Sequence, residues 1–152
     1  MLRPGQPAPD FTLAAAEGTP VTLSKVLASG PVLLYFYPAD FTPGCTREAC
    51  DLRDLHGELA AAGLTVLGVS PQEAASHQRF AAAHNLPFAL LADPDRRVTR
   101  LYDALGPFGL GVRRVTYLIG RDGLIADRVT ADLAIGRHRQ FARRAAASLK
   151  DD

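Results

Sequence analysis

The sequence predicts an α/β protein in which helices flank a central mixed β-sheet. Apolar runs of strand length alternate with segments of helical periodicity through the first two thirds of the chain. Near the carboxyl end, an Asp-Gly turn separates two further apolar runs, which is typical of an antiparallel hairpin. A last helical segment follows. The alternation predicts parallel pairing in the first part, and the hairpin adds antiparallel strands.

The amino-terminal third predicts an extended lead-in, a small hairpin and a central strand. Prolines dominate residues 1–10, and turn-forming residues 17–20 separate two short apolar segments. The continuous apolar run at 32–37 ends at Pro38, which suits a strand that is covered on both faces. The expected strands here are 11–13, 21–23 and 32–37.

The middle of the chain predicts three helices and two buried strands. Leu52, Leu55 and Leu59 are three and four residues apart with charges between them, and Gly63 ends this helical pattern. Ser70-Pro71 and Asp93-Pro94-Asp95 are read as the starts of the next two helices. The expected helices are 42–62, 70–84 and 93–105, and the expected strands are 64–69 and 88–91.

The carboxyl-terminal third predicts a loop, a hairpin and a helix. Residues 106–111, GPFGLG, have the composition of a loop. Strands are expected at 112–119 and 124–129 around an Asp-Gly turn. The last helix is expected over 136–150, with Phe141, Ala145 and Leu149 on one side.

Size and composition indicate one globular domain over residues 1–152. The chain is 47% hydrophobic and 22% charged, and its net charge is +1, which gives no reason to expect nucleic acid or an anionic membrane as a partner. No secretory leader and no apolar run of about 18 residues is found, so the cytoplasm is the expected location. In a reducing compartment, two cysteines are more often catalytic or metal-binding than a permanent disulfide.

Both cysteines lie in the stretch PADFTPGCTREAC, residues 38–50. If Thr42 is the N-cap of a helix, Pro43 occupies its favoured first position and Cys45 the third. The Thr42 hydroxyl is then expected to accept a hydrogen bond from a free backbone N–H of the first turn. Unpaired N–H groups and the positive helix end favour a thiolate at Cys45. The setting therefore predicts a reactive, redox-active thiol.

Cys50 follows Cys45 by five residues on the same expected helix. This spacing gives about 7.5 Å of rise and roughly 140° of rotation, which places the two Cα atoms roughly 8–9 Å apart. A disulfide needs about 4.4–6.8 Å. The two thiols can therefore bond only if the first turns of the helix unwind.

Less specific interpretations of these residues also exist. Cys45 or Cys50 could be an inert core residue. A zinc site is disfavoured because the spacing is C-x4-C and there is no second pair of cysteines. The four histidines have no ligand spacing and are expected on the surface or on helix faces; they are His56, His77, His84 and His138.

At this point the sequence resembles a known family. Pro38, Thr42 and Cys45 match the P-x-x-x-T-x-x-C signature of peroxiredoxins. The longer string FYPADFTPGCTREACDLRD is similar to the bacterioferritin-comigratory, or Q-type, subfamily, and Arg114 opens a matching strand R-V-T-Y-L-I. The likeness covers nearly the whole chain, although the segment between Tyr102 and Arg114 looks short for the subfamily.

The resemblance implies a thioredoxin-like fold and a thiol peroxidase that needs no metal or organic cofactor. Cys45 would be the peroxidatic nucleophile and Cys50 the resolving thiol, with an external dithiol such as thioredoxin as reductant. Thr42 would bind the thiolate and the peroxide, Arg114 would polarise the peroxide, and Pro38 would exclude water. The motif selects Arg114 over Arg113, which points to the opposite face of the strand.

The implied substrates are hydrogen peroxide or alkyl hydroperoxides, and relatives suggest a monomer or a weak homodimer. Two other functions stay open. A thiol–disulfide oxidoreductase on the same fold would be expected to carry C-x-x-C, which is absent here. A redox sensor or inactive scaffold is disfavoured by the intact motif, although a sensor role could coexist with peroxidase activity.

Overall fold

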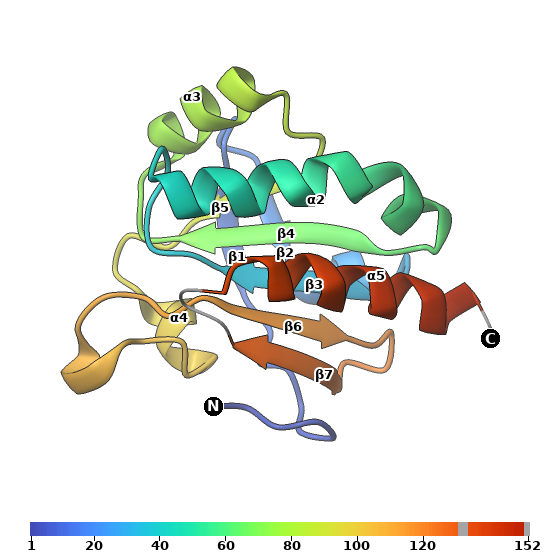
Figure 1. Cartoon of the computed structure of the whole chain (residues 1–152). Helices are drawn as coiled ribbons and strands as arrows, with labels where there is room; N and C mark the ends of the chain where they lie inside the picture. Colours follow the sequence, from blue (N-terminus) through green and yellow to red (C-terminus); the bar gives the residue numbers. More distant parts are fainter. Residues whose placement is uncertain (131–133, 151–152) are drawn as a thin grey trace.

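The computed structural model describes residues 1–130 and 134–150, which form one seven-stranded mixed sheet with helices on both faces (Figure 1). The strands are β1 Thr12–Ala15, β2 Pro20–Thr22, β3 Val32–Phe36, β4 Thr65–Ser70, β5 Ala89–Ala92, β6 Val115–Ile119 and β7 Ile125–Thr130. The helices are α1 Leu23–Leu27, α2 Pro43–Ala61, α3 Ala74–His84, α4 Arg97–Leu101 and α5 Gly136–Lys150, with a short 3-10 turn, η1, at Pro107–Gly109.

The sheet has the strand order β2-β1-β5-β4-β3-β6-β7. β3, β4 and β5 pair in parallel, whereas β6 pairs antiparallel with β3 and β7 antiparallel with β6. The expected parallel first part, the carboxyl-terminal hairpin and the amino-terminal β1–β2 hairpin are therefore confirmed.

Side chains of β3 alternate between two cores, because successive residues of a strand point to opposite faces. Leu33, Tyr35 and, directly after the strand, Tyr37 pack under α2, α3 and α5. Val32, Leu34 and Phe36 pack against α1 and α4 on the other face. In Figure 1, α2 and α5 lie side by side over the sheet, with α3 beyond α2. A central strand covered on both faces is what the apolar run predicted.

Several element boundaries differ from the predictions. Ser70 belongs to β4, because its backbone pairs with Ala92, so α3 begins only at Ala74. The next helix, α4, ends at Leu101, where Tyr102 closes its last turn. Its amino-terminal N–H groups are held by Asp93, which accepts from Thr99 N at 2.8 Å.

Two further differences concern short segments. α1 was not predicted, because five residues are too few to show a helical period. The sequence pattern places Leu23 in a strand, but in the structure it begins this helix. β6 starts at Val115 and not at Val112, which makes only an isolated bridge with Leu105. Within the described residues, no helix is both long and apolar enough to cross a membrane.

Candidate functional site

The segment that carries Cys45 leaves the carboxyl end of β3 and enters α2. Such strand ends border the crevices in which open α/β sheets bind ligands. Thr42 is the N-cap, Pro43 the first helical residue and Cys45 the third, as predicted. Cys45 is only 1% exposed and packs in the core beneath α2. Both cysteines are present as free thiols.

The Thr42 hydroxyl does not cap α2, which corrects the prediction. Its Oγ1 donates to the carbonyl oxygen of Ala39 at 3.0 Å and makes no hydrogen bond to the helix N–H groups. A hydroxyl has one proton and two lone pairs, so donation to Ala39 leaves its acceptor positions for other partners. The backbone carbonyl of Thr42 still accepts from Thr46 N at 2.8 Å and starts the helical ladder.

Arg114 reaches this helix start from the neighbouring strand. It immediately precedes β6, which pairs with β3, and its side chain is buried. A Cβ atom added to Gly44 would lie 2.8 Å from Nη2 of Arg114, so the guanidinium packs directly against the backbone beside Cys45. Arg113, the residue before Arg114, is half-buried. The structure therefore brings Arg114 to the cysteine that the motif pairs it with.

Glu48 is a buried carboxyl one turn after Cys45 that the sequence analysis did not single out. Its Oε1 lies 3.4 Å from Nη1 of Arg114, and its side chain is 1% exposed. Burial raises the pKa of Glu48 to about 8, although the charge and hydrogen bond of Arg114 act in the opposite direction. A carboxyl that is largely protonated near neutrality therefore sits against the arginine of the site.

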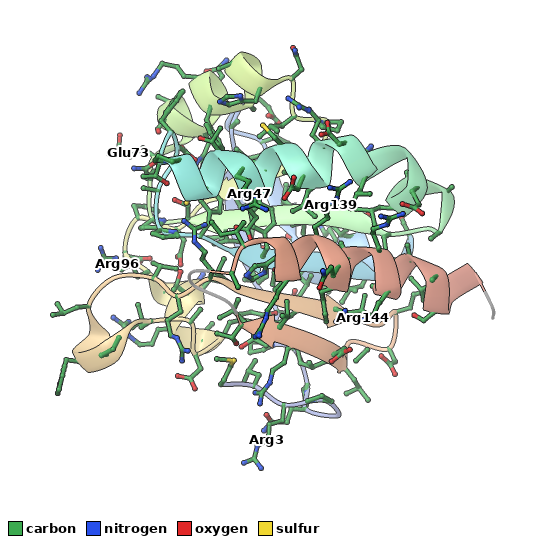
Figure 2. All side chains as sticks on the ribbon, viewed as in Figure 1. Arg3, Arg47, Glu73, Arg96, Arg139 and Arg144 are labelled. Carbon is green, nitrogen blue, oxygen red and sulfur yellow. The ribbon has the colours of Figure 1, made fainter. Side chains whose placement is uncertain are left out.

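His138 of α5 completes this buried cluster. Its Nδ1 lies 3.3 Å from Oε2 of Glu48 and shares a 2.7 Å hydrogen bond with Oγ1 of Thr116. Arg47 of α2 lies between α2 and α5 in Figure 2, with Nη2 3.5 Å from the Cβ position of Gly136. The two helices that cover the site are thus joined by polar as well as apolar contacts.

A second buried network fixes the loop that precedes α2. The Asp40 carboxylate accepts from the Tyr37 hydroxyl at 2.6 Å and the Ser76 hydroxyl at 2.7 Å, and it lies 2.7 Å from Nδ1 of His77. Nε2 of His77 lies 3.1 Å from the carbonyl oxygen of Leu91. Both ring nitrogens of His77 therefore face oxygen acceptors, one on Asp40 and one on the backbone of β5.

The charge of Asp40 is stabilised within this network. Burial alone would raise the pKa of Asp40, but hydrogen bonds from His77, Tyr37 and Ser76 and the His77 charge hold it below its usual value. His77 and His138 are fully buried, so of the two expected positions, the surface or a helix face, they occupy a helix face. Both lie on helices, but on the faces that point into the core.

Between this anchor and Thr42, Phe41 adopts a left-handed conformation with φ of 65°. A bulky residue seldom takes this conformation, which costs of order 1–3 kcal/mol. Its ring is half exposed and contacts Phe80 of α3 edge-on at 5.1 Å. The turn into α2 is therefore strained and is held by contacts on either side of it.

Cys50 lies on the side of α2 that faces α3. It is half-buried, and its Sγ lies 3.8 Å from Nδ1 of His84, the last residue of α3. Cys45, by contrast, points into the core. With α2 continuous from Pro43 to Ala61, the two cysteines occupy different faces of an intact helix, as the spacing predicted.

Pro38 and Arg114 open onto a cleft of about 770 Å³. Its far wall is the segment around η1, which reaches away from the sheet in Figure 1. Leu110, which is 71% exposed, lines that wall. Among residues 1–130 and 134–150, no group of three or more His, Cys, Asp or Glu side chains is placed to hold a metal ion.

Comparisons with known proteins agree on one family. The AhpC/TSA family profile matches residues 4–128. The putative peroxiredoxin bcp of Coxiella burnetii is 44% identical over 128 residues, covering 80% of this chain and 84% of the relative. Peroxidoxin BcpB from Mycobacterium tuberculosis superposes with a TM-score of 0.90 and 33% identity, covering 99% of this chain and 98% of that chain.

A second solved structure is also similar over almost the whole length. The bacterioferritin comigratory protein of Xanthomonas campestris, whose structures were described as trapped intermediate and ligand complexes bearing on alkyl peroxide reduction, gives a TM-score of 0.84. It is 31% identical and covers 98% of both chains. Further matches carry the name peroxiredoxin Q.

Proposed function

The chain belongs to the AhpC/TSA family, in its Bcp and Q branch of peroxiredoxins, and on that premise we propose that Cys45 is the thiol that reduces the peroxide. Family membership gives a thioredoxin-like fold and thiol-dependent peroxide reduction. The observation that carries the assignment is the position of Cys45, third in the first turn of α2, with the Arg114 guanidinium against the preceding Gly44.

In the first step the Cys45 thiolate attacks the terminal oxygen of a hydroperoxide. The O–O bond breaks, and negative charge develops on the leaving oxygen. The Arg114 cation and the free N–H groups of the first helical turn are donors suited to that charge. Cys45 becomes a sulfenic acid, and the leaving alkoxide or hydroxide takes a proton.

Thr42 and Pro38 have supporting roles in this proposal. Because the Thr42 hydroxyl donates to Ala39, its lone pairs can accept a hydrogen bond from the peroxide O–H. Pro38 lies at the mouth of the cleft beside Arg114 and has no N–H to hold water there. Both residues therefore orient the peroxide and limit the access of solvent to the sulfur.

In the second step Cys50 resolves the sulfenic acid. An intact helix holds the two Cα atoms roughly 8–9 Å apart, beyond the reach of a disulfide. The first turns of α2 must therefore unwind before the Cys45–Cys50 bond forms. The strained turn at Phe41 makes that unwinding less costly, because release of the turn relieves its conformation. An external dithiol of the thioredoxin kind then reduces the disulfide by thiol exchange.

The cleft supports a substrate range that includes organic hydroperoxides. Leu110 and Leu105 give its wall an apolar character, whereas the end nearest Cys45 carries Arg114. A hydroperoxide with an alkyl tail matches this arrangement, with its polar end at the cysteine. Hydrogen peroxide has no alkyl tail and therefore needs only the polar end of the cleft. We also propose that the enzyme acts in the reducing cytoplasm, as a monomer or a weak homodimer.

Peroxide turnover by the two cysteine variants tests the proposal. With thioredoxin, thioredoxin reductase and NADPH, the wild-type protein should consume peroxide continuously. Cys45→Ser should consume none, because the nucleophile is lost. Cys50→Ser should consume one equivalent and stop, with a sulfenic acid that dimedone traps. Sustained turnover by Cys45→Ser would overturn the assignment.

A further inference from the structure

The thiol of Cys50 has a histidine within reach. Nδ1 of His84 lies 3.8 Å from its Sγ, across the contact between α2 and α3, and both side chains are half-buried. A thiol is a weak donor with a long hydrogen bond, and a neutral imidazole nitrogen is an acceptor. The contact therefore has the geometry of a hydrogen-bonded Cys–His pair outside the peroxide site.

His84 is fixed at the end of α3 by one contact to its backbone and one to its ring. Arg53, one turn after Cys50 on α2, donates from Nη1 to the carbonyl oxygen of His84 at 2.9 Å. The ring packs edge-on against Phe80 at 5.1 Å. Asn85, in the left-handed conformation, ends α3 directly after His84. The pair is thus a fixed contact between two helices and not a chance approach of mobile side chains.

Cys50 needs a base in order to resolve the sulfenic acid. The thiolate is the attacking species, and an ordinary thiol is only a few per cent ionised at pH 7. We propose that His84 is the general base that ionises Cys50 during disulfide formation. This role rests on the proposed function, in which Cys50 is the resolving thiol, and it adds a catalytic residue to that reaction.

Disulfide formation then takes one proton transfer and one attack on sulfur. The proton of the Cys50 thiol moves to Nδ1 of His84, and the thiolate attacks Sγ of the Cys45 sulfenic acid. An S–S bond forms as the S–O bond breaks, so Cys50 is oxidised and Cys45 is reduced. The departing hydroxide takes a proton, directly or through solvent, from the imidazolium, which leaves water and a neutral His84.

The charged groups around the pair contact partners other than the imidazole. Arg53 contacts the backbone carbonyl of His84 and, through Nε, the carboxylate of Asp54 at 3.1 Å. Asp51, next to Cys50, has Nε of Arg47 3.9 Å from its carboxylate. From the sheet below, Tyr35 acts as a neutral group, because burial raises its pKa well above the usual value.

The first test measures the ionisation of Cys50 without any peroxide chemistry. In a Cys45→Ser background, the rate of iodoacetamide alkylation of Cys50 is followed from pH 5.5 to pH 9.5, a range that spans ordinary imidazole and thiol titrations. With His84 present, the rate should level off near neutrality. With His84→Asn, it should be about tenfold lower at pH 7 and should rise up to about pH 8.5. His56→Asn, a half-buried histidine of α2 away from this pair, is the control and should behave as the parent.

The second test measures the resolving step itself. Reduced protein is mixed with one equivalent of peroxide, quenched in acid, and the sulfenic acid and disulfide are counted by intact mass. In His84→Asn the sulfenic acid should form at the wild-type rate, but its conversion to disulfide should slow at least tenfold at pH 7. Added imidazole should restore part of the lost conversion rate in His84→Asn. His84→Gln should convert the sulfenic acid as slowly as His84→Asn does.

The outcomes separate this inference from the proposed function. If wild-type protein forms a sulfenic acid but never the disulfide, the resolving role of Cys50 fails, whatever the alkylation profile shows. If the disulfide forms, but both His84 variants match the wild type in rate and in pH profile, His84 is not the base. A slowed conversion with an unchanged pH profile and no imidazole rescue would assign His84 a purely structural role and would also overturn the inference.

Discussion

Replacement of Asp40 by alanine tests the buried network that anchors the active-site loop. The change removes the acceptor for the Tyr37 and Ser76 hydroxyls and the counter-charge of His77, all in a site where the Asp40 and His77 side chains are 0% exposed. Loss of one partner of a buried ion pair costs about 3–5 kcal/mol. A protein of this size has a stability of about 5–15 kcal/mol, so the loss is a large fraction of it.

The assay is urea unfolding of the reduced protein at pH 7, followed by far-ultraviolet circular dichroism because the chain has no tryptophan. Asp40→Ala should lower the free energy of unfolding by about 3–5 kcal/mol and the melting temperature by about 6–20 °C. Tyr37→Phe, which removes one donor, should cost only about 1 kcal/mol. Asp54→Ala, an exposed aspartate on α2, should stay within about 0.5 kcal/mol of the wild type.

The same variant should change the acid side of the stability profile. The pKa of Asp40 is held below its usual value in the folded protein, so its contribution is present above the unfolded pKa of about 3.9. That contribution is lost as the pH falls through the lower, folded value. Asp40→Ala should therefore be the least destabilised relative to wild type at the acid end. A cost below 1 kcal/mol at pH 7 would refute the reasoning, because the network would then contribute no more than a surface contact.

Two further predictions concern the residues around Arg114. Gly44→Ala places a Cβ 2.8 Å from Arg114 Nη2 and from Ile135 Cδ1. The rate of Cys45 oxidation by peroxide should therefore fall about tenfold or more. The control is Gly57→Ala, in the same helix with open space around it, which should leave this rate unchanged and raise the free energy of unfolding by about 0.5–1 kcal/mol. An undiminished rate in Gly44→Ala would mean that the guanidinium position is unimportant. Burial raises the pKa of Glu48 to about 8, so between about pH 5 and pH 8 the folded protein keeps a proton on Glu48 that the unfolded chain has lost. The free energy of unfolding should therefore fall as the pH rises through this range. Urea midpoints should show this fall in the wild type and a flatter profile in Glu48→Gln; equal slopes would contradict a buried, neutral carboxyl.

The sequence predicted the elements that carry strong local signals. The apolar run of β3, the leucine spacing of α2 and the Asp-Gly turn between β6 and β7 each correspond to an observed element. The differences lie where tertiary contacts decide. α1 is shorter than two turns, and α4 ends early because Tyr102 turns into the core beside Phe36. Neither effect leaves a periodic pattern in the sequence.

The site was predictable at the cysteines and not at the groups that support them. Cys45 stands in a recognisable helix start, and the motif identifies Arg114. Glu48 was overlooked because a charged residue is usually assigned to a solvated face. Its spacing of four residues from Leu52 nevertheless places it on the buried side of α2. His77 and His138 show the same signal, since each lies three residues before a buried phenylalanine.

The central claim concerns two states of the first turns of α2. When they are folded, they place Cys45 where it can react with peroxide, and they must unwind before Cys45 and Cys50 can form a disulfide. Amide hydrogen exchange, measured by mass spectrometry on the reduced protein and on the protein oxidised by one equivalent of peroxide, tests it directly. We predict that amides from Cys45 to about Arg53 exchange much faster in the disulfide form, whereas amides of β3 and α5 do not change. A disulfide form whose α2 amides stay as protected as in the reduced protein would contradict the account.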